Sequence, residues 1–169
     1  MKMNIHANVK KMASEVKEAT FAMAKSSFKQ RNGALKVLIE NLHKHQKMIF
    51  QANQQDIVIA KENGLSAALL DRLSLEGRLE GIIHDIEQVI DLPDPIGEVF
   101  EEHILPNQLN LTKCRTPLGV LGVIYESRAN VTLDISMRTI KSGNCALLRG
   151  GSETLLTNQI LVEIIQKSL

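Results

Sequence analysis

The stretch of residues 118–154 constrains the fold of this chain more than any other. It begins with an apolar, almost uncharged run (118–125), which is typical of a strand buried on both faces of a parallel sheet. A polar turn (126–130) and a segment with helical spacing follow, and a second short apolar run (145–148) comes after a Gly-Asn pair. The order strand, helix, strand predicts a βαβ crossover, with a further helix opening at Ser152.

The residues before this stretch show two other periodicities. Through most of residues 1–96 the apolar side chains have helical spacing, which predicts amphipathic helices. The predicted helices cover residues 9–23, 30–53, 54–62, 66–73 and 79–90. From Gly97 the pattern alternates, and two antiparallel strands, 99–105 and 109–115, are predicted around a Pro-Asn turn. Because an isolated two-stranded ribbon is marginal in water, we expect it to join a larger sheet or another subunit.

Together these patterns predict an α/β protein in three parts. An N-terminal helical layer (1–96) precedes a β-ribbon (97–116), and a partial βαβα unit (117–169) follows. A parallel sheet of two strands cannot bury both of its faces unaided. The sequence therefore looks cut short, and we expect more strands to follow in a complete domain.

The composition narrows the class of protein. With 44% hydrophobic and 23% charged residues, the chain is typical of a soluble globular protein. A formal net charge of +1 argues against a nucleic-acid or membrane-surface partner, and 3% aromatic residues argue against base-stacking platforms. No apolar stretch approaches the roughly 18 residues that span a bilayer, and the N-terminus lacks a signal-peptide core. We therefore expect a soluble, cytoplasmic protein.

Both cysteines fall on predicted strands. Cys114 precedes the βαβ unit and Cys145 lies in its second strand, and their spacing is not that of a metal site. In the cytoplasm they are expected to be reduced structural thiols. The sequence also lacks a Gly-x-Gly-x-x-Gly motif, a Walker loop, a catalytic triad and a pair of catalytic carboxylates. It offers groups that can bind ligands, but no obvious reactive group.

Two polar turns follow the two core strands, where open α/β sheets bind their ligands. The second turn contains Arg149, Gly150, Gly151 and Ser152. Glycines let a ligand approach the backbone, and a helix N-terminus with Arg and Ser beside it supplies donors for an anion. The alternative is an ordinary glycine turn in which Ser152 is the N-cap.

The first turn contains Glu126, Arg128 and Asn130. The helix is predicted to begin at Val131, so the Asn130 side chain can act as its N-cap. The same amide can instead donate to a developing oxyanion above the strand ends. Arg128 can hold a carboxylate or phosphate through its planar guanidinium, or it can lie in solvent.

Seven motifs, spread over nearly the whole chain, resemble those of a known family. They are Asn53–Asp56, Asn63–Ser66, Leu70–Leu73, Pro117–Glu126, Arg128 with Asn130-Val-Thr, Lys141–Asn144 and Leu148–Thr154. The family is that of the γ-glutamyl phosphate reductases (glutamate-5-semialdehyde dehydrogenases), which act in proline biosynthesis and belong to the aldehyde dehydrogenase superfamily. The resemblance implies an aldehyde-dehydrogenase-type Rossmann domain, of which this chain holds the first βαβ portion. It also implies that the β-ribbon is part of an oligomerisation element.

The resemblance implies a reaction as well. In this family NADPH reduces γ-glutamyl phosphate to glutamate-5-semialdehyde with release of phosphate, through a thioester and a thiohemiacetal on a cysteine. By position, Asn130 matches the oxyanion-hole asparagine, and Glu126 and Arg128 are expected to bind substrate. Arg149 matches a cationic residue beside the adenosine ribose, and the adjoining Gly150, Gly151 and Ser152 are expected to bind cofactor. NAD-preferring relatives often carry a glutamate in place of Ser152, so a 2′-phosphate should be tolerated here, consistent with NADPH.

The chain also departs from the family pattern. Ala129 replaces a proline that usually precedes the asparagine, which removes a backbone restraint. The family's catalytic cysteine belongs to a later domain that this sequence does not contain, and neither Cys114 nor Cys145 matches it. We therefore expect the chain to be inactive alone, and to form a homo-oligomer or pair with a C-terminal fragment. The alternatives are a non-catalytic module that binds nucleotide or pairs with another subunit, and a decayed remnant.

Overall fold

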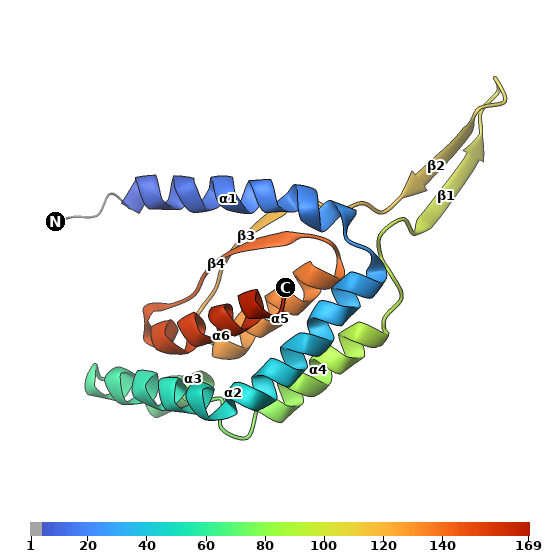
Figure 1. Ribbon diagram of the computed structural model, residues 1–169. Helices are drawn as coiled ribbons and strands as arrows, with labels where there is room; N and C mark the ends of the chain where they lie inside the picture. The colour runs from blue at the N-terminus through green and yellow to red at the C-terminus, as the bar shows by residue number, and fades with distance from the viewer. Residues whose placement is uncertain (1–4) are drawn as a thin grey trace.

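The computed structural model describes residues 5–169 (Figure 1). Along the chain the elements come in the order α1 (Ile5–Lys25), α2 (Phe28–Glu62), α3 (Ala67–Leu73), α4 (Leu79–Asp91), β1 (Val99–Ile104), β2 (Asn110–Cys114), β3 (Val120–Ile124), α5 (Ala129–Lys141), β4 (Cys145–Arg149), a 3₁₀ helix η1 (Ser152–Thr154) and α6 (Leu155–Lys167). The predicted α/β class and the order of the elements are confirmed.

The longest helix, α2, begins at a capping box. The Ser27 side chain accepts from the Gln30 amide at 3.2 Å, and the Gln30 side chain accepts from the Ser27 amide at 2.8 Å. The helix ends at Asn63-Gly64, where Gly64 has a φ of 82° that favours glycine. The sequence therefore contains recognisable signals at both ends of this helix.

The division of this helix into two predicted segments is wrong. Residues 28–62 form one helix of 35 residues, with no break between Asn53 and Gln54. No glycine or proline interrupts the chain there, and Asn53 and Asp56 are buried against other elements. The break predicted after Asn53 therefore falls inside α2, at a turn of the helix that contacts other elements.

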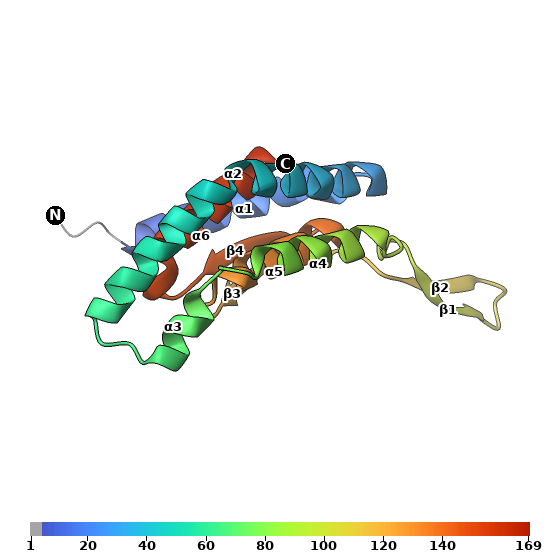
Figure 2. The same cartoon turned by 90° about the horizontal axis from the view of Figure 1, so that it is seen from below.

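The core lies among α2, α4, α5 and α6, so the N-terminal helices and the βαβα unit share one set of buried side chains. Helix α2 contacts α6, α4 and α5, and α4 lies beside α5 (Figures 1 and 2). The buried cluster includes Leu35, Leu38, Leu42, Ile49, Ile86, Leu133, Met137, Leu161 and Ile164. Removal of this apolar surface from water is the main stabilising contribution to the fold.

The predicted βαβ crossover is present. Strands β3 and β4 are parallel, with a register from Val120↔Cys145 to Ile124↔Arg149. In both views α1 lies on one side of this sheet and α5 on the other, and both helices contact β4 (Figures 1 and 2).

The expected burial of β3 on both faces is not observed. Ile124 is 78% exposed and Val120 is 37% exposed. Among residues 5–169, β4 is the only strand paired with β3, and α1 contacts β3 less than β4. The apolar strand therefore leaves part of its surface in solvent.

The β-ribbon projects away from the helices (Figure 1). Its strands β1 and β2 are antiparallel, as predicted, and ion pairs cross it from Arg115 to Glu98 at 2.6 Å and from Lys113 to Glu101 at 2.5 Å. Within the part of the chain that the structure describes, the ribbon pairs only with itself, so the expected larger sheet is absent there. Phe100 and Ile104 are 56% and 75% exposed.

Candidate functional site

The two polar turns meet at one edge of the β3–β4 sheet. Because the strands are parallel, their carboxyl ends lie together, and the Tyr125 amide donates to the Arg149 carbonyl at 3.1 Å. The turn that carries Asn130 and the turn that carries Arg149 are thus side by side. Both turns that carry the predicted site residues therefore lie at this edge, and the roles of those residues stay predictions.

Asn130 is not the N-cap of α5. The helix begins at Ala129 and its N-cap position is Arg128, which makes no side-chain capping bond, so Asn130 lies in the first helical turn. Its half-buried side chain lies beside the carboxylate of Asp134, one turn further on. The cap interpretation is therefore wrong, and the oxyanion role stays a prediction.

The carboxyl group of Asp134 has a raised pKa. Partial burial is the main cause, the negative charge of Asp85 on α4 adds to it, and Arg138 and Asn130 act in the opposite direction. Asp134 is thus a titratable group directly beside the proposed oxyanion donor. Sequence reasoning missed it, because its environment depends on the packing of α4 against α5.

Glu126 lies between two arginines. Its Oε2 is 3.7 Å from Nε of Arg128 and 3.9 Å from Nη1 of Arg72, a residue of α3. All three side chains are about half exposed or more, so these pairs contribute little to stability. A carboxylate or phosphate that bound Arg128 would compete with Glu126 for the same guanidinium.

The two glycines after Arg149 are closely packed against side chains of the protein itself. A Cβ on Gly150 would lie 2.5 Å from Nδ2 of Asn158, and one on Gly151 would lie 1.8 Å from Oγ of Ser127. The backbone of the second turn therefore lies close to Asn158 of α6 and to Ser127 of the first turn. The glycines by themselves do not demonstrate a ligand.

Glu153 connects the two turns through hydrogen bonds. Its carboxylate accepts from the hydroxyl of Ser127 in the first turn, and from Oγ of Ser152 at 3.1 Å. The hydrogen bond from Ser127 is the main cause of the lowered pKa of Glu153. Ser152 is not a cap, since η1 has Gly151 at its N-cap position and no side-chain capping bond. The sequence showed Glu153 only as a residue of a first helical turn, because its partner lies in another loop.

The N-terminus of α6 already holds an anion. The Asp56 carboxylate, from α2, accepts from the amides of Leu156 at 3.2 Å and Thr157 at 2.8 Å, and from the Thr157 hydroxyl at 2.7 Å. Asp56 is only 4% exposed. The expectation that this helix start offers free N–H groups to a ligand is therefore wrong at these two amides.

A chain of hydrogen bonds runs beneath the site. The Tyr125 hydroxyl bonds Thr132 at 2.6 Å, and Thr132 donates to Asn158 at 2.7 Å. Asn158 in turn donates to Thr154 at 3.0 Å. These contacts connect the end of β3 with α5, α6 and η1, so the two turns rest on a hydrogen-bonded base.

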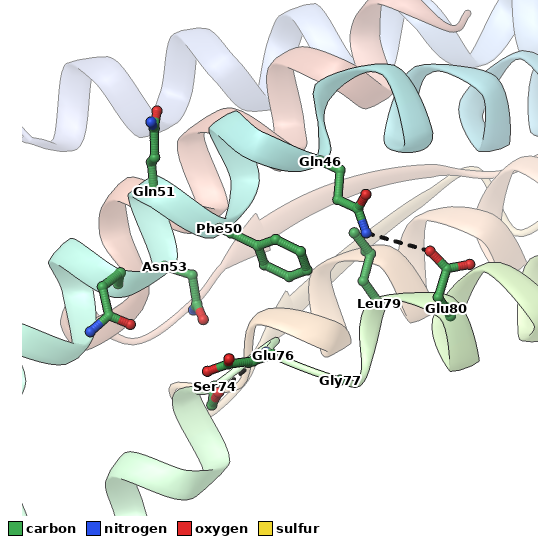
Figure 3. A pocket seen from close by; sticks show the side chains of 10 residues that line it. Gln46, Phe50, Gln51, Asn53, Ser74, Glu76, Gly77, Leu79 and Glu80 are labelled. Atoms are coloured by element: carbon green, nitrogen blue, oxygen red, sulfur yellow. Dashed lines mark hydrogen bonds between the residues drawn. The ribbon is translucent and has the colours of Figure 1, made fainter.

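A cleft of about 350 Å³ opens beside the strand ends. Its lining residues are Leu65, Leu69, Arg72, Leu73, Glu126, Ser127 and Glu153. A larger cleft, of about 510 Å³, lies between α2 and the segment that connects α3 to α4. Phe50, Leu79 and Glu76 are among the side chains that line it (Figure 3). The larger cleft contains none of the predicted site residues.

Neither thiol lies at the carboxyl edge of the sheet. Cys114 is exposed on β2, and Cys145 is opposite Val120 at the other end of the sheet. Burial raises the pKa of the Cys145 thiol, which disfavours the reactive thiolate. Over residues 5–169 there is no group of three or more His, Cys, Asp or Glu side chains that could hold a metal ion. No helix in that range is long and apolar enough to cross a membrane.

Comparison with known proteins identifies close relatives. No protein-family model matches the sequence. The γ-glutamyl phosphate reductase of Psychromonas ingrahamii is 48% identical over 154 residues, which are 90% of this chain and 37% of that protein. The γ-glutamyl phosphate reductase of Haemophilus influenzae is 43% identical over 162 residues, or 95% of this chain and 39% of that protein.

Solved structures agree with these relatives. The crystal structure of γ-glutamyl phosphate reductase from Thermotoga maritima superposes with a TM-score of 0.88 at 39% identity, over 93% of this chain and 38% of that one. The structure of the Saccharomyces cerevisiae γ-glutamyl phosphate reductase gives 0.89 at 34% identity, over 94% and 40%. A putative aldehyde dehydrogenase from Bacillus subtilis, with a TM-score of 0.66 and 18% identity, shares the fold. The chain thus spans about 37–40% of the length of these reductases.

Proposed function

We propose, because this chain is a homologue of the N-terminal part of γ-glutamyl phosphate reductases, that it contributes ligand-binding residues to such an enzyme. The reaction is the NADPH-dependent reduction of γ-glutamyl phosphate to glutamate-5-semialdehyde, with release of phosphate, in proline biosynthesis in the cytoplasm. The observation that carries the proposal is the identity of 43–48% over at least 90% of the chain. The meeting of both matched turns at one sheet edge supports it.

The first turn and the start of α5 would bind the substrate. The Asn130 amide would donate to the acyl oxygen as negative charge develops there, which lowers the barrier to attack on the acyl carbon. Arg128 and Glu126 would hold charged groups of the substrate, with Arg128 as the donor to carboxylate or phosphate oxygens. Because Oε2 of Glu126 lies 3.7 Å from Nε of Arg128, an anionic group of the substrate at Arg128 would share the guanidinium with that carboxylate.

The second turn would bind the adenosine end of the cofactor. NADPH, when bound, supplies the hydride. Arg149 is exposed, and among residues 5–169 it has no ion pair or side-chain hydrogen bond, so its guanidinium is available to a 2′-phosphate. The Ser152 hydroxyl would have to leave Glu153 to donate beside it, and Gly150 and Gly151 keep the turn close to Asn158 and Ser127. Since Asp56 occupies the start of α6, the residues present fit a phosphate on Arg149 better than one on the helix.

A titration of the purified chain with NADPH tests this assignment. We expect measurable binding for the unchanged chain, and a loss of about tenfold in Arg149→Ala, since a charge-assisted bond to phosphate accounts for an effect of that order. Lys36→Ala is the matched control, because Lys36 is an exposed cation on α2 for which no ion pair is found in residues 5–169. Equal affinities in all three proteins would refute the role of Arg149.

An activity assay tests the missing nucleophile. With no thiol at the strand ends, we expect no oxidation of NADPH above a no-protein control when the purified chain meets γ-glutamyl phosphate. Turnover well above that control, lost in Cys145→Ser or Cys114→Ser, would overturn this proposal. The homology favours the reductase over the alternative of an unrelated binding module.

The ribbon would pair subunits of the same protein. Phe100, Ile104 and Leu109 expose 56%, 75% and 61% of their surface, which is apolar area that a second subunit or a C-terminal fragment can cover. We expect the molar mass from light scattering to fall in Ile104→Glu if the unchanged chain is a homo-oligomer. A monomeric unchanged chain would instead favour pairing with a C-terminal fragment.

A further inference from the structure

Asp56 belongs to the helical layer, yet all its side-chain hydrogen bonds within residues 5–169 go to α6. It accepts three of them, from two backbone amides and one hydroxyl, at 2.7–3.2 Å. A carboxylate at a helix N-terminus is stabilised by the helix dipole and by hydrogen bonds to the free amides. Because the residue is only 4% exposed, water cannot replace these bonds, and they determine where the carboxylate can lie.

Asn53, one turn earlier on α2, contacts the same threonine of α6 as Asp56 does. Its amide donates to the Leu73 carbonyl at 2.8 Å and to the Thr157 hydroxyl at 3.3 Å, and its oxygen accepts from the Leu75 amide at 2.8 Å. The Thr157 hydroxyl is therefore contacted by both residues. As a result, the α3–α4 segment and the start of α6 are held by a single turn of α2.

The start of α6 is in turn connected to the glycine turn. Asn158 donates to Oγ1 of Thr154 at 3.0 Å, and Thr154 donates to the Gly151 carbonyl at 3.4 Å. Only η1 separates Gly151 from α6. A displacement of the first turn of α6 would therefore move the backbone that carries Arg149 and Ser152.

We propose that Asp56 is a positioning residue for the nucleotide turn of residues 149–154. It touches neither substrate nor cofactor, and acts through Leu156 and Thr157 to hold that turn at the carboxyl edge of the sheet. The assignment of the turn to a nucleotide rests on the proposed function, whereas the mechanical role of Asp56 does not. A purely structural cap would stabilise the whole fold without a separate effect on the turn.

Amide hydrogen exchange of the purified chain tests the mechanical role. In Asp56→Ala we expect exchange at residues 150–157 to become about tenfold faster or more, since charge-assisted hydrogen bonds contribute that much to local opening. Exchange in α4 and in β1–β2 should change much less. Asp56→Asn, which keeps one acceptor oxygen but no charge, should lie between. Glu62→Gln is the matched control, because it removes a carboxylate from an exposed position of the same helix.

Binding of NADPH tests the consequence for the site. We expect the dissociation constant to rise by about tenfold in Asp56→Ala, and by less in Thr157→Val, which removes one of the three donors but leaves both amides. The dissociation constants are compared only among variants that are folded, which a cooperative urea transition establishes. Glu62→Gln should bind like the unchanged chain.

The outcomes separate this inference from the proposed function. Exchange that accelerates equally in all elements of Asp56→Ala would overturn the inference. Local acceleration with an unchanged dissociation constant would also overturn it if Arg149→Ala weakens NADPH binding, because the turn then binds nucleotide without needing Asp56. Absence of NADPH binding in the unchanged chain would contradict the proposed cofactor role alone. In that case the exchange pattern by itself decides whether Asp56 holds the turn.

Discussion

Asp94 is the counter-ion of a buried arginine, and its replacement by asparagine perturbs a charge cluster that joins three parts of the fold. Arg31 is 3% exposed, and its Nη2 is 2.7 Å from both carboxylate oxygens of Asp94. The same guanidinium donates to the Lys141 carbonyl at 3.2 Å. Asp94→Asn keeps the shape of the side chain and one acceptor, but it leaves Arg31 without its negative charge.

The magnitude follows from burial. Removal of one partner of a fully buried pair costs about 3–5 kcal/mol, because the other charge stays desolvated and unpaired. Asp94 itself is 30% exposed, so water can partly replace it, and we expect a loss of about 2–3 kcal/mol in the free energy of unfolding. Such a loss is a large fraction of the stability of an ordinary domain, roughly 5–15 kcal/mol.

A second cation makes the effect dependent on pH. Lys141 is 4% exposed, and its Nζ donates to Asn32 at 2.9 Å and to the Ile90 carbonyl at 2.8 Å. Burial is the main cause of its lowered pKa, which Asp94 partly restores and Arg31 lowers further. Above the lowered pKa the folded state binds fewer protons than the unfolded state, so stability rises with pH up to the ordinary lysine value. Asp94→Asn should extend this rise to lower pH.

Urea denaturation followed by circular dichroism measures both effects. With a slope of about 2 kcal/mol per molar, a loss of about 2–3 kcal/mol lowers the midpoint by roughly 1–1.5 M. Asp71→Asn is the matched control, because Asp71 pairs with Arg78 at 2.8 Å but the two side chains are 72% and 46% exposed. That variant should lose at most about 1 kcal/mol. If Asp94→Asn shifts the midpoint no more than Asp71→Asn, the reasoning from burial is refuted.

Three further predictions concern the site and the core. Gly151→Ala should lose about 1–3 kcal/mol of stability, because the backbone φ of −65° permits alanine but its Cβ would lie 1.8 Å from Oγ of Ser127; Ser127→Gly in the same chain should restore much of it. The stabilising contribution of Glu153 is present above the ordinary glutamate pKa and is lost as pH falls through its lowered pKa. Glu153→Gln should therefore be less stable near neutrality, and its thermal unfolding temperature should fall less as the pH is lowered. Leu161→Ala should cost about 2–5 kcal/mol by urea denaturation, because Leu161 is 0% exposed in the core beside α2; a loss below about 1 kcal/mol would contradict the packing described.

Local patterns were enough for the strands and for the edge of the sheet at which the two polar turns lie. The alternation around residues 99–115, the apolar run of β3 and the turn residues between them correspond to the observed strands, because such signals arise within a few neighbouring residues. The parallel pairing of β3 and β4 also follows from the crossover between them. Once the strands are parallel, Asn130 and Arg149 must lie at the same edge.

Local patterns failed where a side chain has a distant partner. The helix boundary predicted between Asn53 and Gln54 does not exist, and Asn53 and Asp56 are buried contact residues inside α2. Ser152 and Asn130 have residue types typical of N-caps, but neither caps a helix. Capping preference describes which side chains can accept a hydrogen bond from the free amides at the start of a helix. It does not say whether another group already does so.

The sequence by itself determined the order and type of the elements, the βαβ crossover and the placement of two polar turns at its carboxyl edge, because these depend on periodicity and on chain direction. Only the tertiary structure decided which groups the turns contact. Asp56 reaches Thr157 across 101 positions of sequence and Glu153 reaches Ser127 across 26, and no local signal marks either contact. The physical reason is that hydrogen-bonding groups are satisfied by whatever packing brings near them, and that packing is set by the whole core.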